Sequence, residues 1–252
     1  HSQVSTFKKG ADAMVGASRS AVAGEDEIRE NAKIELEAQL FFAKIFEERK
    51  AAPQNDLMSA FVHSQTEDED PLSMHELQNM MHQLITGGFE TTQSAINHGM
   101  WALIRYPELV VKLKEDASLL KPFIEEVLRW EAPVQFLARR ATKDVELNGT
   151  LIPKDSMILV GYGPASRDES KFACPHQFDI ERSNVGAHLA FGSGGHFCPG
   201  ALLARQEMMS SFSGLIQRLD NIELARPLPA PVHNFSLFFL PMKEFHVKFT
   251  KA

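Results

Sequence analysis

The sequence is poor in cysteine, in net positive charge and in long apolar runs, and each shortage excludes a class of protein. Two cysteines in 252 residues cannot build a disulfide framework, so we expect a reducing compartment. A formal net charge of −7 disfavours nucleic acid as a partner, because phosphate contacts need a basic surface. No apolar run approaches the roughly 20 residues that span a bilayer. We therefore expect a cytoplasmic protein without a nucleic-acid or membrane partner.

The sequence also lacks internal repeats, low-complexity segments and a visible secretory signal. It begins at His1 rather than at a methionine, so the missing signal is weak evidence about targeting. A hydrophobic fraction of 44% and a charged fraction of 23% are ordinary for a soluble globular protein with a sizeable core.

Helical periodicity dominates the first two thirds of the chain. Ser73 followed by Glu76 is a capping-box pattern and predicts the start of a long helix, which Tyr106-Pro107 should end. Asn148-Gly149 within an alternating segment predicts a β-hairpin. The expected helices cover 25–51, 56–62, 73–103, 108–115, 121–130 and 201–219, with a strand over 156–162 and a final hairpin over 234–249. The fold class expected is mainly α with small β-sheets.

The long helix carries an unusual segment, LITGGFETT, in its middle. Gly87 and Gly88 each cost the helix roughly 1 kcal/mol relative to alanine. One interpretation is close packing of helices beside a solvated Glu90. The other is that the glycines let a large, flat group approach the backbone, where Glu90 and Thr91 would supply a proton path in a locally bent helix.

A second candidate is EEVLRW, in which Glu126 and Arg129 lie on one helix face. Taken alone, this spacing favours an exposed surface pair worth a few tenths of a kcal/mol. Arg182, at the end of FDIER, carries little meaning by itself.

Cys198 has an unusual setting, whereas Cys174 is expected to be a small buried hydrophobic residue. Cys198 precedes Pro199-Gly200 and a run of helix formers, so the helix dipole and free amides favour a thiolate there. A nucleophile would need a base, and only His196 is near in sequence. A zinc site would need further ligands, whereas a haem iron needs only one thiolate from this loop. The local sequence alone therefore allows Cys198 to be either a catalytic nucleophile or a metal ligand.

Three motifs, in this order, resemble those of cytochrome P450 enzymes. LITGGFETT is similar to the oxygen-activation segment of the family's long central helix, and EEVLRW contains its E-x-x-R pair. FGSGGHFCPG followed by ALLAR resembles the haem-binding signature, with Phe191, Gly194, Cys198, Gly200, Leu203, Ala204 and Arg205 in register. The resemblance extends from about residue 57 to the C-terminus. It implies the C-terminal, helix-rich portion of the P450 fold.

We expect a single haem-thiolate domain over 1–252 that is incomplete at its N-terminus, with a helical lead-in over 1–70 and the motifs in 71–252. Complete family members are much longer. Missing sequence is favoured over a true half, because a half would expose a large apolar surface.

The resemblance also implies a haem b cofactor and roles for individual residues. Cys198 would be the axial thiolate of the haem iron, and Phe191 would shield the sulfur. Arg139 and His196 would bind the haem propionates, with Arg140 as an alternative to Arg139. Loop glycines would let the chain turn under the ring, and a buried network would lie behind the haem. The loop glycines are Gly192, Gly194 and Gly200, the helix glycines beside the haem are Gly87 and Gly88, and the network is Glu126, Arg129 and Arg182.

By the same resemblance, the activity is a monooxygenase reaction that hydroxylates or dealkylates a small apolar organic substrate with dioxygen. Glu90 and Thr91 would relay protons during dioxygen activation. No flavin or iron–sulfur motif is visible, so electrons would come from an external ferredoxin and its reductase or from sequence outside these 252 residues. Ordinary core packing is the alternative for every candidate that would face the substrate. Those candidates are Leu84, Val134, Phe136, Leu137, Phe238 and Phe239.

Two alternatives stay open. A peroxide-driven or decarboxylating relative would use the same haem, but such relatives usually lack an acid–alcohol pair like Glu90-Thr91. A non-catalytic haem-binding remnant of the fold is favoured by the short length and opposed by the same pair.

Overall fold

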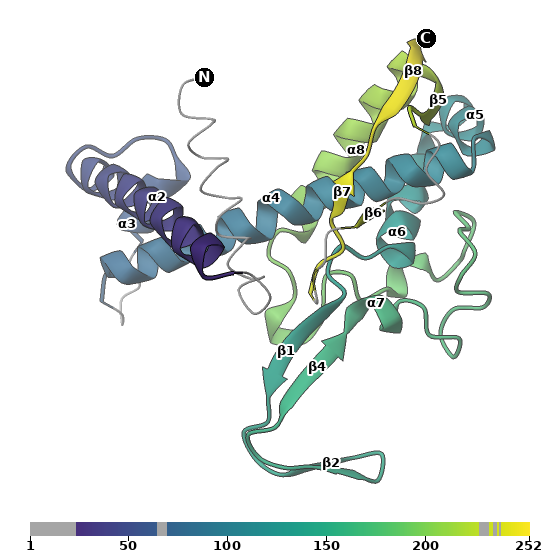
Figure 1. Cartoon of the computed structure of the whole chain (residues 1–252). Helices are drawn as coiled ribbons and strands as arrows, with labels where there is room; N and C mark the ends of the chain where they lie inside the picture. Colours follow the sequence, from purple (N-terminus) through teal and green to yellow (C-terminus); the bar gives the residue numbers. More distant parts are fainter. Residues whose placement is uncertain (1–23, 65–69, 227–231, 234–235, 237) are drawn as a thin grey trace. The chain divides into compact units, whose positions relative to one another are not determined.

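The computed structural model of the protein describes residues 24–64, 70–226, 232–233, 236 and 238–252 (Figure 1). The elements are mostly helices joined to short two-stranded sheets, the class that the sequence predicted. The chain divides into two compact units, with the boundary between Glu90 and Thr91. This boundary lies inside a single continuous helix, α4 (Met74–Arg105).

The first unit consists of α2 (Glu25–Ala51), α3 (Leu57–Val62) and the first half of α4. The bounds of α2 agree with the sequence prediction, and its acidic first turn and basic last turn suit the helix dipole. Asp56 caps α3 by accepting a hydrogen bond from the Ser59 amide at 2.8 Å. The three helices bury a small core made of Ala38, Phe42, Phe46, Leu77 and Ile85.

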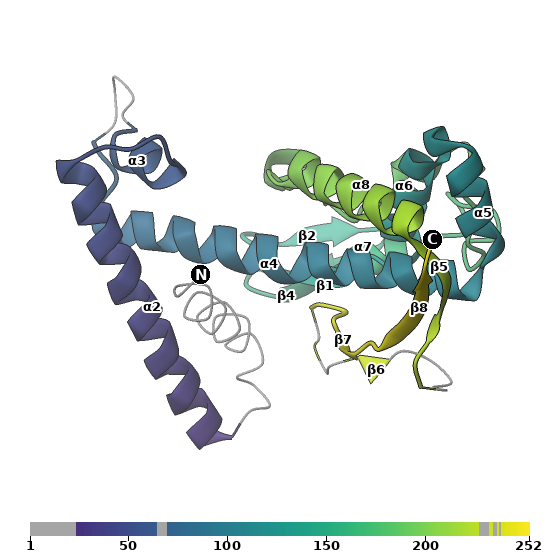
Figure 2. The same cartoon turned by 90° about the horizontal axis from the view of Figure 1, so that it is seen from above.

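The predicted capping box begins α4. The Ser73 amide donates to Glu76 Oε2 at 2.8 Å, and the Glu76 amide donates to Ser73 Oγ at 3.3 Å. The helix runs without a break through Gly87 and Gly88 and ends at Arg105, directly before Tyr106-Pro107 (Figure 2). The sequence therefore predicted both ends of this helix.

The second unit packs α5 (Glu108–Glu115), α6 (Leu120–Trp130) and α8 (Ala201–Arg218) with the second half of α4. Figures 1 and 2 both draw α8 alongside α4. Gly99 makes this close approach possible, because a Cβ there would lie 2.2 Å from Phe212 Cζ. The centre of the core consists of Ala102, Leu103, Phe123, Val127, Met208 and Phe212.

The rest of the second unit contains short helical turns. They are η1 (Ala117–Leu119), α7 (Tyr162–Ala165), η2 (Val185–Ala187) and η3 (Gly194–His196). Among the residues that the structure describes, no helix combines the length and the apolar character that crossing a bilayer requires.

Each sheet in the described part is an antiparallel pair of strands. β1 (Phe136–Arg140) pairs with β4 (Met157–Gly161), and β2 (Val145–Leu147) pairs with β3 (Thr150–Ile152). The β2–β3 turn is the predicted hairpin, with positive φ values of 49° at Asn148 and 76° at Gly149. The remaining pairs are β5 (Leu219–Leu224) with β8 (Val247–Lys251) and β6 (Val232–His233) with β7 (Met242–Glu244).

Two sequence predictions need correction. The predicted final hairpin is confirmed only in part: β7 pairs antiparallel with β6, which lies just before the predicted range, whereas β8 pairs with the distant β5; residues 234, 235 and 237 lie outside the described part. Local turn signals carry no information about such a distant partner. Cys174 is exposed, not buried. Its φ of +47° and the hydrogen bond from the Gln177 amide to its carbonyl place it in a tight turn at the surface.

Candidate cofactor site

The loop from Phe191 to Gly200 holds Cys198 directly before α8. Gly192 and Gly194 adopt φ values of 72° and 73°, in the left-handed region that favours glycine. The Cys198 amide donates to the Phe191 carbonyl at 3.0 Å, which closes the loop on itself. Cys198 is partly buried, and its carbonyl accepts a hydrogen bond from the first residue of α8. The thiol therefore lies at a helix N-terminus, as the sequence predicted.

Apolar side chains around this thiol are unusually exposed. Phe197 is 52% exposed, and Leu202 and Leu203 on the first turn of α8 are 83% and 63% exposed. The half-buried ring of Phe191 lies 6.5 Å from that of Phe197. An exposed apolar surface of this kind marks a place where a partner or a ligand binds.

The two expected propionate ligands, Arg139 and His196, are both exposed. His196 lies in η3. On β1, Arg139 Nη2 donates to the Tyr162 hydroxyl at 3.3 Å, and a Cβ at Gly192 would lie 3.7 Å from the same Tyr162 ring. Arg139 is thereby connected to the Cys loop through Tyr162. Arg140 instead forms an ion pair with Asp155 at 2.8 Å, which favours Arg139 as the candidate.

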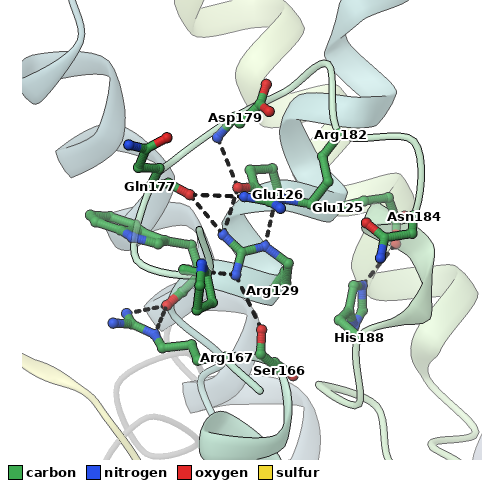
Figure 3. Close-up of polar contacts among 12 residues, drawn as sticks. Glu125, Glu126, Arg129, Ser166, Arg167, Gln177, Asp179, Arg182, Asn184 and His188 are labelled. Carbon is green, nitrogen blue, oxygen red and sulfur yellow. Dashed lines mark hydrogen bonds and ion pairs between the residues drawn. The ribbon is translucent and has the colours of Figure 1, made fainter. Parts of the chain in front are cut away.

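Glu126 and Arg129 form a fully buried ion pair, so the interpretation as an exposed surface pair was wrong. Arg129 donates to the Glu126 carboxylate through Nε at 2.6 Å and through Nη2 at 2.7 Å. Its remaining donors reach the carbonyls of Ser166, Pro175 and Gln177 at 2.8 to 3.1 Å (Figure 3). All five guanidinium N–H groups thus have an acceptor.

Arg182 lies beside this pair. Its Nε is 3.6 Å from Glu126 Oε2, within ion-pair range but too far for a hydrogen bond. Its terminal nitrogens donate to the carbonyls of Ala173, Cys174 and Gln177. The carbonyl-rich segment 166–182 is thereby fixed to α6.

A second charged cluster on α6 was missed in the sequence. Glu125, directly before Glu126, accepts two hydrogen bonds from Arg205 and lies 3.0 Å from His188 Nε2. Arg205 had been placed in the motif without a role, and His188 had not been considered. The partners lie 63 and 80 residues from Glu125, and no local pattern announces such a contact.

The glycines of α4 are not explained by packing within the described part of the chain. A Cβ at Gly88 would meet no atom within 4 Å, and one at Gly87 would approach only the Gln83 side chain, at 3.7 Å. This argues against close helix packing as the reason for the glycine pair. Glu90 and Thr91 follow on the same helix and are both partly buried.

The candidate substrate-facing residues fall into two groups. In the second unit, Val134 forms a bridge with Phe239, and the Gln135 amide donates to the Phe238 carbonyl at 2.8 Å. Phe136 and Leu137 follow on β1, so these residues form one neighbourhood. Leu84 belongs to the first unit and is 42% exposed.

The donor set indicates the kind of cofactor that this site could hold. In the described ranges, no group of three or more histidine, cysteine or acidic side chains could hold a metal ion. One thiol in an exposed apolar surface, with an exposed arginine and an exposed histidine as further donors, fits a flat apolar group that brings most of its own metal ligands and carries carboxylates. Fold and donor set together favour a protein that binds a cofactor of this kind.

Comparison with known proteins places the chain in a family. Residues 26–249 match the family model for Cytochrome P450. The chain is 36% identical over 244 residues to the cytochrome P450 YjiB of Bacillus subtilis, covering 96% of this chain and 60% of that protein. It is 38% identical to the cytochrome P450 monooxygenase PikC of Streptomyces venezuelae, covering 73% and 44% of the two chains. The structure of CYP109Q5 from Chondromyces apiculatus superposes with a TM-score of 0.87 at 32% identity, covering 100% and 61%.

The chain therefore belongs to the cytochrome P450 family, whose cofactor is haem b. It spans about half to three fifths of the length of these relatives.

Proposed function

We propose that the chain is the haem-binding part of a monooxygenase that uses dioxygen to hydroxylate or dealkylate a small apolar organic substrate. The observation that carries this proposal is the Cys198 loop: one thiol at a helix N-terminus, turned by two left-handed glycines and surrounded by exposed apolar side chains. A thiolate in this setting suits a metal that takes a single protein ligand.

Each residue at the site has a task that its position supports. Cys198 supplies the thiolate, and Phe191 shields the sulfur. Arg139 and His196 bind the cofactor's carboxylates, because the guanidinium of Arg139 and a ring N–H of His196 can both donate hydrogen bonds to a carboxylate. When bound, the haem supplies the redox chemistry of dioxygen activation. Glu90 takes up and passes on protons, and the Thr91 hydroxyl both donates and accepts hydrogen bonds along that path.

Substrate and electron donor follow from the same neighbourhood. Val134, Phe136, Leu137, Phe238 and Phe239 present apolar atoms, which favours an apolar substrate. PikC is named a monooxygenase, which supports the reaction class. For the electron donor we propose a ferredoxin-type protein, because no flavin or iron–sulfur motif lies within these 252 residues.

The reduced carbon-monoxide spectrum of the haem-loaded chain tests the ligand. We expect the red-shifted Soret band of thiolate ligation, which Cys198→Ser should remove. The matched control is Cys174→Ser, which changes the only other cysteine and should leave the band unchanged. A band that survives in Cys198→Ser, or one typical of histidine ligation in the parent chain, would overturn the proposal.

A further inference from the structure

A second buried ion cluster lies beside the Cys loop, separate from the Glu126–Arg129 pair. Arg205 Nε donates to Glu125 Oε1 at 2.6 Å, and Arg205 Nη2 donates to Oε2 at 2.9 Å. His188 Nε2 lies 3.0 Å from the same Oε2. Glu125 and His188 are each only 8% exposed. The cluster joins α6, the segment before the Cys loop and α8.

The hydrogen bonds fix the charges of this cluster. The Ala190 amide donates to His188 Nδ1 at 3.2 Å, so Nδ1 carries no proton and Nε2–H donates to Glu125. Burial raises the pKa of Glu125, but hydrogen bonds from Arg205 and His188 outweigh this effect and hold that pKa at about 2. Glu125 is thus an anion held by the Arg205 guanidinium and by the His188 ring.

Arg205 also contacts the Cys loop. Its guanidinium carbon lies 4.5 Å from the centroid of the Phe191 ring, a cation–π arrangement. The carbonyl of Phe191 in turn accepts the Cys198 amide at 3.0 Å. Hydrogen bonds to Glu125 raise the pKa of Arg205 despite its partial burial, and the charge of Cys198 adds to this rise. Arg205 Nη1 also donates to the Ala201 carbonyl at 3.4 Å, and the Ala201 amide donates to the Cys198 carbonyl at 3.3 Å, so the guanidinium lies beside the loop that carries the sulfur.

We propose that Glu125, His188 and Arg205 form a positioning cluster that anchors the Cys198 loop to α6 and sets the electrostatic potential at the sulfur. Arg205 makes the potential at Sγ more positive, and Glu125 limits that effect. His188 holds the Glu125 carboxylate in place through its Nε2, 3.0 Å from Oε2. The proposal rests on the proposed function only in that Cys198 is the haem ligand.

A pair of alkylating reagents measures this potential directly. The full chain, purified without added haem and carrying Cys174→Ser, has Cys198 as its only thiol. Iodoacetate is an anion and iodoacetamide is neutral, but they are similar in size and attack the same sulfur. The ratio of their rates therefore reports local charge, while changes in thiolate fraction or access cancel. Arg205→Gln should lower this ratio by about twofold or more at low salt, and Glu125→Gln should raise it by a similar factor.

Controls separate charge from loosening of the fold. Arg218→Gln removes a cation elsewhere on α8 and should leave the ratio unchanged. Arg205→Lys keeps the charge and should keep the ratio of the parent. Added salt should shrink both shifts, because it screens charges near the surface.

Opposite shifts in Arg205→Gln and Glu125→Gln support the proposal. Unchanged ratios, or shifts in the same direction, overturn it, since a merely structural cluster would loosen the loop in both variants. If far-UV circular dichroism shows that Arg205→Gln is unfolded, the proposal is tested with Glu125→Gln and Arg205→Lys instead. A fall of the iodoacetate-to-iodoacetamide rate ratio in Glu125→Gln then overturns the proposal. None of these readouts needs the carbon-monoxide spectrum. A failure of the positioning-cluster proposal can therefore be distinguished from a failure of the proposal that Cys198 binds haem.

Discussion

Two adjacent carboxylates on α6 serve different parts of the molecule. Consecutive residues on a helix point about 100° apart, so Glu125 and Glu126 face different neighbours. Glu126 binds Arg129 and accepts the Asp179 amide at 2.8 Å, whereas Glu125 binds Arg205 and His188. Because α6 is buried from Phe123 to Trp130, both charges depend on these partners. A single helical turn thereby holds both the carbonyl-rich segment and the Cys loop.

Removing Arg129 should destabilise the chain severely. Arg129→Met fills much of the same volume but leaves Glu126 as an unpaired buried anion, which costs about 3–5 kcal/mol. Urea unfolding followed by circular dichroism measures the loss. The matched control is Arg140→Met, which breaks an exposed ion pair with Asp155 and should cost about 1 kcal/mol or less. A loss for Arg129→Met as small as that of the control would contradict the role of the buried pair.

The hydroxyl of Thr91 should affect the coupling of oxygen consumption to product formation. If Thr91 relays protons, Thr91→Ala removes the donor and acceptor, and oxygen would be consumed with less product formed. Thr91→Ser keeps the hydroxyl and should keep most of the coupling. The measurement is the ratio of product formed to oxygen consumed, with the electron donor and substrate supplied. Tight coupling in Thr91→Ala would remove this residue from the mechanism.

At the scale of elements, the sequence predicted those helix ends and turns that residues close together in the chain determine. The capping box at Ser73, the stop at Tyr106-Pro107 and the Asn148-Gly149 hairpin are local signals, and all three are confirmed. The pairing of β5 with β8 was missed, because the pair closes a long loop and depends on packing rather than on a turn. Likewise, the position of Cys198 at a helix N-terminus could be predicted from the residues of the loop itself. The contacts of Glu125 with Arg205 and His188 form only when α6 and α8 pack together, so no local pattern predicts them.

Two glycines of α4 should respond in opposite directions to the same substitution. Gly99→Ala would place a Cβ 2.2 Å from Phe212 Cζ, so α4 and α8 must separate. We expect a loss of about 1–3 kcal/mol in the free energy of unfolding. Gly88→Ala meets no described atom within 4 Å and should gain up to about 1 kcal/mol from helix propensity.

Urea midpoints of the haem-free chain measure both effects. Combining Gly99→Ala with Phe212→Leu removes the ring that clashes and should recover part of the loss. Equal shifts for the two glycines would mean that helix propensity alone, and not the approach of α8, governs position 99.

At the scale of the whole molecule, acid should weaken the fold in two stages. Burial lowers the pKa of His98 from 6.5 to about 4, with a smaller lowering from the nearby His233. Between these two values the unfolded chain binds a proton that the folded chain does not, so stability falls as pH falls from 6.5 to 4. The folded pKa of Glu125 is also lowered, from 4.5 to about 2, so its contribution is complete above pH 4.5 and is lost as pH falls toward 2.

The free energy of unfolding measured from pH 8 to pH 3 tests the first stage. His98 contributes a slope of at most about 1.4 kcal/mol per pH unit, between roughly pH 6.5 and pH 4. His98→Gln keeps a side-chain donor for the Glu131 carbonyl, which lies 3.0 Å from His98 Nδ1, but cannot be protonated, so it should flatten this slope. His246 is half exposed, and His246→Gln should leave the slope unchanged. If the slope persists in His98→Gln, another group causes it. Because His98 lies on α4 and the carbonyl it binds follows α6, a flattened slope would mean that this junction, and not the exposed histidines, sets the pH at which the second unit begins to unfold.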